Sequence, residues 1–410
     1  MKLVKGVFFV FIAGNFASLG NFLYNLAMGR MLDPAVYGEL EAILSLSSLI
    51  VVPLSVLSVF IVKIVSSYWG QHKYQEVQSF LTVYRRKLFS VGLSGSVILL
   101  LFGPLLIRFL NLNSVWSVVF LSLLFLLSGL TTVNNGGLQG VLSFGYLAIN
   151  GIVGTGLKLL VSLSLVFLNF QLFGALFGPM FGGLIAFLLS IFELKKIFKG
   201  VNTADKKVST LIFRDTFLPI LFGSLALTIL STMDIILARH FFTQTISGEF
   251  AIIAVLGKIV FYAVGPIISV MFPLISSRAS NGTPYILPLL GSLVMSLGVG
   301  SIIVFGFFMF PELILKILFA GKYSETAPYL GPYAFYMILF SIDSLLTYFL
   351  LSVSHYRPMP VLFIISLLQG GLIILFHNSI SQLIWVNIFV AAFYLLIVSG
   401  FVIRKERHVS

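Results

Sequence analysis

The residues of this sequence best placed to do chemistry are charged side chains inside long apolar stretches. Lys158, Lys258, Asp234 and Asp343 each lie in a run of mostly apolar residues. A charge at the centre of a membrane helix costs about 2.5 to 3.5 kcal/mol on insertion scales, so each of these residues is a candidate for function. The lysines would attract an anionic group such as a phosphate, and the carboxylates would bind and release a cation or a proton.

Each of these charges also has a structural interpretation. Asp234 and Lys258 are expected on adjacent antiparallel helices, where they could form a structural ion pair instead of a site. Lys158 and Asp343 come from different halves of the chain and have no charged counterparts at equivalent positions. We expect them to face an internal cavity, with a buried pair between the halves as the alternative.

Polar side chains also occupy the first two apolar runs. Asn21 and Asn25 lie one helical turn apart, and their amides could bind sugar hydroxyls or bond to a neighbouring helix. Arg30 follows them as a further cationic candidate. Glu39 and Glu41 open the second run, where they could compensate the helix dipole or, as a gate, contact Arg30.

The elements that must position these side chains are membrane helices. The hydrophobic fraction is 59% and the charged fraction 9%, far from the soluble norm. Apolar runs long enough to cross a core of roughly 30 Å recur along the chain, and backbone in lipid must satisfy its own hydrogen bonds, which favours helices. We expect about twelve spans, at residues 7–29, 39–62, 88–110, 115–133, 143–168, 172–192, 211–238, 249–275, 286–310, 329–352, 359–376 and 382–403.

The distribution of lysine and arginine predicts the orientation of these spans. With the N-terminus inside, 18 of these residues fall on the inner side and 5 on the outer side, and Lys158 and Lys258 lie within spans. The positive-inside rule therefore predicts a multi-pass protein of the cytoplasmic membrane with both termini in the cytoplasm. The net charge of +12 is explained by inner loops near anionic lipid, so no nucleic-acid partner is expected.

The chain repeats itself at about half its length. The segment from Tyr24 to Leu44 aligns with the segment from Met233 to Ile253. This alignment pairs Asn25 with Asp234 and Arg30 with Arg239 at an offset of 209, and Gly38 with Gly248 at an offset of 210. A half-length repeat in a membrane chain is typical of transporters whose substrate site lies between the repeats near mid-bilayer. We therefore expect an all-α integral membrane protein with two parallel-repeat six-helix bundles around a central cavity, over residues 1–200 and 201–410.

Shorter features add packing and topology. Segment 70–87 is basic and amphipathic and predicts an interfacial helix, while 193–215 is the expected linker between the lobes. Gly174, Gly178 and Gly182 share one helix face and predict close helix packing. The chain has no cysteine and none of the phosphate-loop, HExxH or GxSxG motifs, so neither a metal site nor an enzyme is expected.

Three segments resemble a known family. AMGRMLDPAVYGELEAIL resembles the helix-loop-helix opening of the polysaccharide flippases of the multidrug/oligosaccharidyl-lipid/polysaccharide exporter superfamily. In that family a small residue, an Arg, a Pro and a Tyr/Phe-Gly pair recur at this spacing, and here they are Ala27 or Gly29, Arg30, Pro34, Tyr37 and Gly38. The segments from Leu138 to Asn150 and from Leu318 to Phe335 resemble the loop after the fourth span and the entry to the tenth.

The resemblance implies a transporter that flips a lipid-linked oligosaccharide, carried on a polyprenyl pyrophosphate, by alternating access. The expected partners are that lipid-linked glycan, membrane lipids and a polysaccharide polymerase or assembly protein. No cofactor is expected beyond coupling to a proton or sodium gradient. The resemblance implies no role for Asp234 or Asp343, because neither matches a motif of the family.

Combining the residues with this chemistry gives two sets of candidates. Substrate binding is assigned to Lys158, Lys258, Asn21, Asn25 and Arg30, and ion coupling or gating to Asp343, Asp234 and Glu41. The alternatives are a cation-coupled multidrug exporter of the same superfamily, a flippase of the peptidoglycan precursor, and a lipid scramblase or assembly scaffold.

Overall fold

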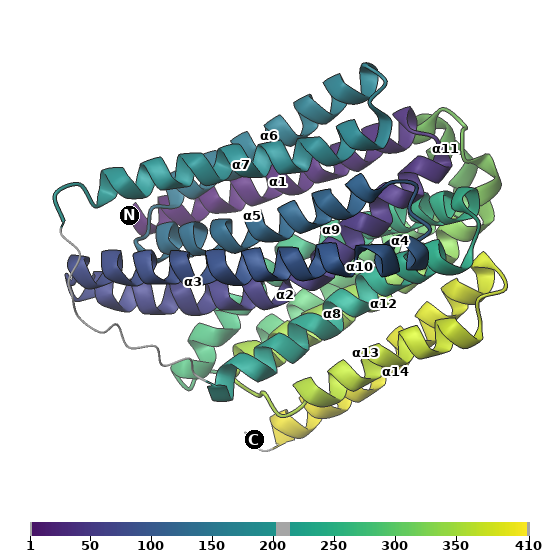
Figure 1. The fold of residues 1–410 in the computed structure, drawn as a ribbon. Helices are drawn as coiled ribbons and strands as arrows, with labels where there is room; N and C mark the ends of the chain where they lie inside the picture. The colour runs from purple at the N-terminus through teal and green to yellow at the C-terminus, as the bar shows by residue number, and fades with distance from the viewer. Residues whose placement is uncertain (1, 202–213, 408–410) are drawn as a thin grey trace. The chain divides into compact units, whose positions relative to one another are not determined.

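The described part of the chain folds into helices joined by short connections (Figure 1). The computed structural model describes residues 2–201 and 214–407, with side chains described over 16–201 and 217–405. The helices from the first half are α1 (Lys2–Met31), α2 (Pro34–Gly70), α3 (Tyr74–Leu101), α4 (Gly103–Phe109), α5 (Val115–Gly140), α6 (Phe144–Phe167) and α7 (Gln171–Ile197). Those from the second half are α8 (Arg214–Phe241), α9 (Gln244–Ser280), α10 (Ile286–Met309), α11 (Pro311–Phe319), the 3-10 turn η1 (Ser324–Thr326), α12 (Ala327–Ser352), α13 (Met359–Leu375) and α14 (Ile380–Arg407).

The chain divides into two compact units that are not simple halves of the sequence. The first unit comprises Met1–Leu32 and Ile50–Phe213, and the second comprises Asp33–Leu49 and Arg214–Ser410. The opening turns of α2 therefore belong with the second half of the chain, while the rest of that helix belongs to the first unit. A division of the fold at residue 200 remains a prediction.

The helices of the two halves follow one another in the same order and with similar lengths. Both α2 and α9 have 37 residues, and each is followed by a long helix, then a short one, α4 with 7 residues and α11 with 9. In the first unit α6 packs against α1 and α7, and in the second unit α13 packs against α8 and α14 (Figure 1). This shared pattern agrees with the repeat seen in the sequence.

Nine helices in the described part of the chain are long and apolar enough to cross a membrane. The number rises to ten if α3 and α4, which meet at an angle of 59°, form one broken span. The apolar helix α13 has 17 residues and is shorter than the other candidates. The ranges expected to span the membrane overlap one helix each in the described residues, except that 88–110 covers the end of α3 and the whole of α4. The structure supports nine or ten spans where about twelve were expected.

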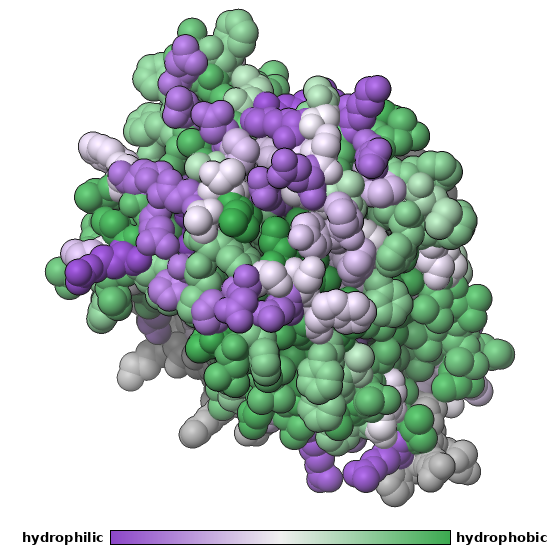
Figure 2. All heavy atoms as spheres, turned by 90° about the vertical axis from the view of Figure 1, so that its right-hand side faces the viewer, coloured by the Kyte–Doolittle hydropathy of each residue, from purple (hydrophilic) through white to green (hydrophobic). Residues whose placement is uncertain are grey.

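The surface of the protein fits a membrane environment. Figure 2 shows one end of the molecule, where hydrophilic side chains gather over the helix ends while hydrophobic side chains cover the flanks. Many large apolar side chains are mostly exposed, such as Phe167, Leu287 and Leu396. Lipid tails can cover such side chains, whereas water would disfavour them.

The segment 70–87, expected as an interfacial element, is not a separate element. A turn at Gln71–Lys73, in which His72 has a positive φ of 58°, separates α2 from α3. From Tyr74 the helix then continues without a break to Leu101, because no proline or glycine interrupts it before Gly92. The basic residues of this segment therefore lie on a long helix. Most of the expected linker, at 202–213, lies outside the described residues.

The glycine face of α7 packs closely on α6, as predicted. A Cβ atom on Gly182 would overlap the carbonyl oxygen of Gly154, and one on Gly178 would overlap the hydroxyl of Ser162. Both positions also abut the backbone of Lys158. The glycines thus let α7 hold the stretch of α6 that carries this lysine.

Candidate functional site

The first polar cluster, called here the lysine cluster, lies where α1, α6 and α7 meet in the first unit. The Nζ atom of Lys158 donates a hydrogen bond of 2.8 Å to Oδ1 of Asn21 and lies 3.9 Å from the centre of the Tyr24 ring. The Tyr24 hydroxyl donates to the carbonyl of Ala175 at 2.8 Å and so fixes the ring. An aromatic face stabilises a cation without neutralising it, and the amide is also neutral. These contacts therefore fix the position of the ammonium.

The other substrate-binding candidates are not part of this cluster. Asn25 lies one turn further along α1 and is partly buried, and Arg30 is exposed in the last turn of the same helix. Lys258 is partly buried on α9, in the second unit. Of the five predicted residues, the structure brings Lys158 and Asn21 into contact.

The second polar cluster, called here the aspartate cluster, surrounds Asp234 on α8. This residue is fully buried, and its Oδ2 accepts hydrogen bonds from the Tyr333 hydroxyl at 2.7 Å and from Nδ2 of Asn387 at 2.9 Å. Its Oδ1 accepts from the backbone N–H of Ile235 at 2.8 Å. Lys258 lies near enough to attract this carboxylate but forms no ion pair with it. The expected structural pair is thus replaced by three hydrogen-bond donors.

The aspartate cluster extends through a second amide. Nε2 of Gln369 donates to Oδ1 of Asn387 at 2.8 Å and to the carbonyl of Leu230 at 3.2 Å. The Tyr336 hydroxyl donates to the same carbonyl. The Oε1 atom of Gln369 is buried without a hydrogen bond from any described residue. The cluster therefore gathers several oxygen atoms, one of them anionic, which is the donor set that hard monovalent and divalent cations prefer.

Asp343, on α12, is as buried as Asp234 but has different surroundings. Neither of its carboxylate oxygens accepts a hydrogen bond from any residue that the structure describes. Thr347, one turn further, lies 3.0 Å from the Tyr394 hydroxyl, so its hydroxyl is engaged elsewhere. A buried carboxylate without donors is costly, which marks Asp343 as a residue with a role beyond packing.

The third feature is a buried ion pair in the second unit. Nη2 of Arg239 lies 3.5 Å from Oε2 of Glu39, and its Nη1 donates to the Ala35 carbonyl at 3.0 Å and to the Ser247 hydroxyl at 3.2 Å. Arg239 is the repeat counterpart of Arg30, the partner that the sequence suggested for Glu39. Glu41, on the next turn of α2, is also buried and lies near Tyr262.

Two glycines that the repeat relates to each other pack beside this ion pair. A Cβ atom on Gly38 would lie 2.7 Å from the backbone nitrogen of Gly248. One on Gly248 would overlap the carbonyl group of Pro34. The first turns of α2 and α9 thus meet backbone to backbone, and the Arg239 contacts hold them together.

Sequence reasoning missed several residues of these clusters. Tyr24, Tyr333, Gln369 and Asn387 were not among the candidates. Gln369 and Asn387 carried a usable signal, because each is an isolated amide within an apolar run. The tyrosines carried none, since aromatic side chains are frequent throughout this chain.

A family model matches most of the chain. The model is described as "Polysaccharide biosynthesis protein", and the match covers residues 27–328. No match to the chain was found among curated protein sequences.

Solved structures share the fold across nearly the whole chain. An inward-facing multidrug resistance MATE family transporter of the MOP superfamily matches with a TM-score of 0.76 at 13% identity, covering 96% of this chain and 99% of its own. The lipid II flippase MurJ, in an inward closed conformation, matches with a TM-score of 0.69 at 15% identity, covering 97% and 87%. A MOP superfamily transporter from Pyrococcus furiosus, whose reverse binding-pocket polarity suggests a different function, matches with a TM-score of 0.61 at 12% identity, covering 97% and 95%.

These identities are low, so the structural matches establish the fold. The family match and the transporter fold agree with the expectation of a multi-pass membrane transporter rather than an enzyme. The chain belongs to the polysaccharide biosynthesis protein family and has the fold of the MOP superfamily transporters.

Proposed function

We propose that this protein flips an oligosaccharide linked to a polyprenyl pyrophosphate across the cytoplasmic membrane, for polysaccharide biosynthesis. The family match supports the link to polysaccharides. The observation that carries the choice of an anionic lipid-linked substrate is the lysine cluster. Its ammonium lies on a largely apolar helix against an amide and an aromatic ring, and an ammonium is a group that binds phosphate.

The chemistry asked of such a site is modest. The diphosphate must leave water while the polyprenyl tail stays in lipid, and Lys158 offsets the cost of that desolvation. Asn21 and Asn25 offer amide groups to the sugar hydroxyls. Lys258 and Arg30 supply further positive charge along the path. Alternating access of the two units, with both termini in the cytoplasm, would carry the glycan from the inner to the outer leaflet.

The buried carboxylates fit a coupling or gating role. In this proposal Asp234 and its oxygen-rich cluster bind the driving cation, a proton or a sodium ion, and Asp343 carries a proton. Glu41 would take part in gating next to the Glu39–Arg239 pair. The role of each residue in coupling is separable by measuring transport against pH and against a sodium gradient.

The first prediction concerns Lys158 directly. The substitution Lys158→Ala should lower the initial rate of flipping by about 10- to 100-fold, because a hydrogen bond to a charged group contributes about 1.5 to 3 kcal/mol. The rate is measured in proteoliposomes with a fluorescent polyprenyl-pyrophosphate oligosaccharide whose outer-leaflet pool is destroyed by an added reagent. Lys158→Arg, which keeps the charge, should retain part of the rate.

A matched control lies on the same helix. Ser164 is exposed on α6 and bonds to the carbonyl of Leu160, so Ser164→Ala should transport normally. A normal rate for Lys158→Ala, with the protein folded and inserted, would remove this lysine from the mechanism.

Two related substrates are distinguished in the same vesicles. The fold shared with a lipid II flippase favours a peptidoglycan precursor, which carries the same diphosphate, as the second candidate. The fold shared with multidrug transporters keeps a cation-coupled drug exporter as the third. Faster transport of a labelled peptidoglycan precursor would select the second candidate, and transport of a cationic dye instead of either lipid would select the third.

A further inference from the structure

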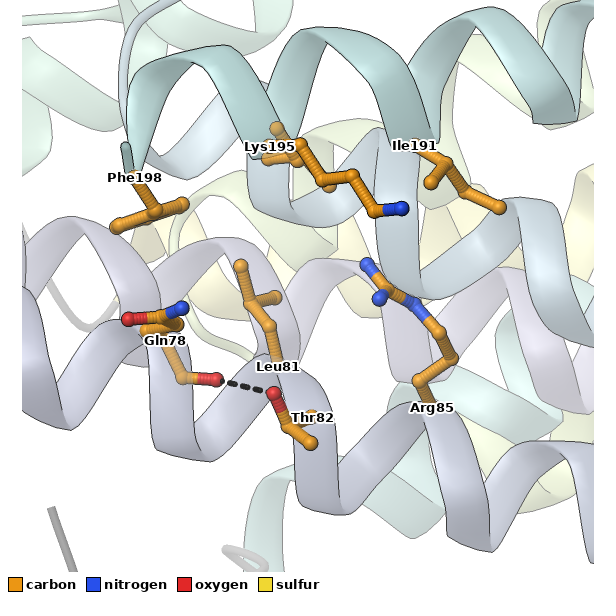
Figure 3. Close-up of a pocket in the computed structure, with 8 residues that line it drawn as sticks. Gln78, Leu81, Thr82, Arg85, Ile191, Lys195 and Phe198 are labelled. Atoms are coloured by element: carbon orange, nitrogen blue, oxygen red, sulfur yellow. Dashed lines mark hydrogen bonds between the residues drawn. The ribbon is translucent and has the colours of Figure 1, made fainter. Parts of the chain in front are cut away.

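A pocket in the first unit lies between α3 and α7 and shares no residue with the lysine cluster (Figure 3). Its volume is about 180 Å³. Polar side chains on its wall include those of Gln78, Thr82, Arg85 and Lys195, and the apolar ones include Leu81 and Phe198. None of the described residues that line it is acidic.

Two cations of this pocket point toward one another. Figure 3 shows the ammonium of Lys195 and the guanidinium of Arg85 converging across the pocket from α7 and α3. In an α-helix the side chains lean toward the N-terminus of their own helix. Since α3 begins and α7 ends at the same end of the unit, this lean brings the two side chains together (Figure 1).

The available hydrogen-bond donors of these cations exceed the acceptors around them. Arg85 donates from Nε and Nη2 to Oδ1 of Asn134, at 3.2 and 2.9 Å, and its Nη1 donates to no described residue. That amide is itself fixed by a bond of 2.7 Å from Nδ2 to the Ser190 hydroxyl. Lys195 makes no hydrogen bond with any described residue. Two like charges that converge without an acceptor repel each other, and an anion between them would remove that repulsion.

The neutral wall of the pocket suits the same kind of ligand. The amide of Gln78 makes no hydrogen bond with another described residue, and its Oε1 is buried. The amide nitrogen can therefore serve as a third donor. Leu81 and Phe198 would contact the apolar part of the ligand.

We propose that the pocket between α3 and α7 binds a phosphate group, held by Arg85 and Lys195. Two sources can supply this group: the headgroup of an anionic phospholipid, whose acyl chains would lie against the apolar wall, or soluble phosphate. Lys195 lies in the last turn of α7, which is basic, and the positive-inside rule assigns this end of the helix to the cytoplasmic leaflet, which is rich in anionic lipid. The site is distinct from the lysine cluster, so this proposal does not depend on the transported substrate.

The position of one tryptophan allows a direct test. The Trp69 ring lies 6.1 Å from that of Phe198, which lines the pocket. The other two tryptophans, Trp116 and Trp385, are 61% and 64% exposed, so Trp116→Phe and Trp385→Phe can remove them with little effect on packing. The remaining fluorescence then reports on lipid next to the pocket.

The measurement uses the full-length protein in phosphatidylcholine vesicles that contain an increasing fraction of phosphatidylglycerol. In one series the phosphatidylcholine carries brominated acyl chains, which quench tryptophan fluorescence, and in a second series the phosphatidylglycerol carries them. Comparing the two series gives the ratio of the binding constants of the two lipids at the pocket. We expect phosphatidylglycerol to be preferred, and Lys195→Gln to lower that preference about 5-fold, the contribution of one cation near a membrane surface. Arg85→Gln should act similarly, and thermal unfolding checks whether loss of its bonds to Asn134 has disturbed the fold.

Neighbouring residues provide matched controls. Arg86 and Lys196 carry the same charges one residue further along α3 and α7, are exposed, and do not line the pocket. Arg86→Gln and Lys196→Gln should leave the preference within a factor of about 2. An equal loss in these controls would indicate diffuse surface charge and overturn the proposal.

A second arm identifies the source of the phosphate. Inorganic phosphate is titrated against the protein in phosphatidylcholine vesicles, with the thermal unfolding midpoint as the readout. Stabilisation by phosphate that Lys195→Gln abolishes, without a preference for phosphatidylglycerol, would assign the site to soluble phosphate. A preference for phosphatidylglycerol without such stabilisation assigns it to lipid, and the absence of both would overturn the proposal.

Discussion

Two aspartates in the second unit show how strongly the surroundings of a residue decide its role. Asp234 and Asp343 are both fully buried, yet the first accepts three hydrogen bonds and the second accepts none from the described residues. The three donors can stabilise an anion at Asp234, whereas Asp343 has no such support. The sequence placed both residues in apolar spans but did not predict the side-chain donors of Asp234, because Tyr333 and Asn387 come from distant helices.

This difference predicts opposite effects of the same substitution. Asp234→Asn replaces one acceptor oxygen by an NH₂ group. This donor would face another donor, either the N–H of Ile235 or the donors of Tyr333 and Asn387. The substitution should therefore destabilise the fold by about 1 to 3 kcal/mol. Asp343→Asn breaks no hydrogen bond with a described residue and removes a buried ionisable group, so the stability of this variant should be equal or higher. Unfolding in detergent, followed by circular dichroism, compares the two. If both variants were destabilised equally, Asp343 would have a hydrogen-bond partner other than the residues described here.

The loop between α12 and α13 contains a histidine with a perturbed pKa. Burial lowers the pKa of His355, and the positive charges of Lys405 and Arg357 lower it further. A histidine whose pKa is lower in the folded than in the unfolded state takes up its proton first in the unfolded state, so acid favours unfolding.

The resulting prediction is that stability falls as the pH drops below about 6.5, through the lower pKa of the folded state. His355→Gln should remove part of this fall, and Lys405→Gln should make it smaller. The measurement is the thermal midpoint of each variant between about pH 5 and 8. An identical pH dependence in His355→Gln and the parent protein would contradict the assignment.

At the scale of the helices, the first turns of α2 and α9 approach one another closely at two glycines that the repeat relates. Gly38 and Gly248 occupy equivalent positions in the two halves, and each provides the space that the other helix needs. Gly248 faces a backbone carbonyl, which cannot rotate away as a side chain can. Only glycine fits there.

Gly248→Ala should therefore destabilise the protein by more than about 2 kcal/mol, because its methyl group overlaps the carbonyl of Pro34. The control is Gly291→Ala on α10, where a methyl group meets nothing within 4 Å. That substitution should be neutral or stabilise by up to about 1 kcal/mol through helix propensity. The two variants are compared by thermal unfolding, and similar midpoints would show that the α2–α9 contact can relax.

The sequence predicted the helices well because lipid leaves the backbone a single way to satisfy its hydrogen bonds. It indicated a separate interfacial element at 70–87, where a basic amphipathic pattern fits both an interfacial helix and the start of a long one. It also suggested Arg30 for Glu39, whereas the salt bridge described forms with Arg239, the equivalent residue of the other repeat. An internal alignment shows which residues are equivalent, but contacts between equivalent residues depend on packing that it does not contain.

At the scale of the whole molecule, α2 is the element that belongs to both units. The second unit includes its residues up to Leu49, and the first unit continues from Ile50. Pro53 lies within the helix just after this boundary. A proline lacks the N–H that would bond to the carbonyl four residues earlier, and here that carbonyl belongs to Leu49. The backbone hydrogen bonding of α2 is thus interrupted close to the residue where the helix passes from the second unit to the first.

We therefore expect Pro53→Ala to stiffen the helix at the boundary between the units. Transport in proteoliposomes should slow severalfold, while stability should be unchanged or rise by up to about 3 kcal/mol, the cost of a proline in a helix interior. Pro266→Ala removes a proline from α9, which lies wholly in the second unit, and should slow transport less. A normal rate for Pro53→Ala would exclude bending at this point as a step in the cycle.

The shared helix also bears on how the two halves of the chain can be made separately. A fragment that starts after the linker lacks Glu39 and the helical turn that contains Gly38. Arg239 would then be buried without the carboxylate of Glu39. The backbone at Gly248 would also lose the turn of α2 that packs on it. A fragment that ends before the linker carries the missing turns. When the two fragments are co-expressed, the first turns of α2 in the N-terminal fragment can dock on the C-terminal fragment. The C-terminal fragment alone would lack these turns.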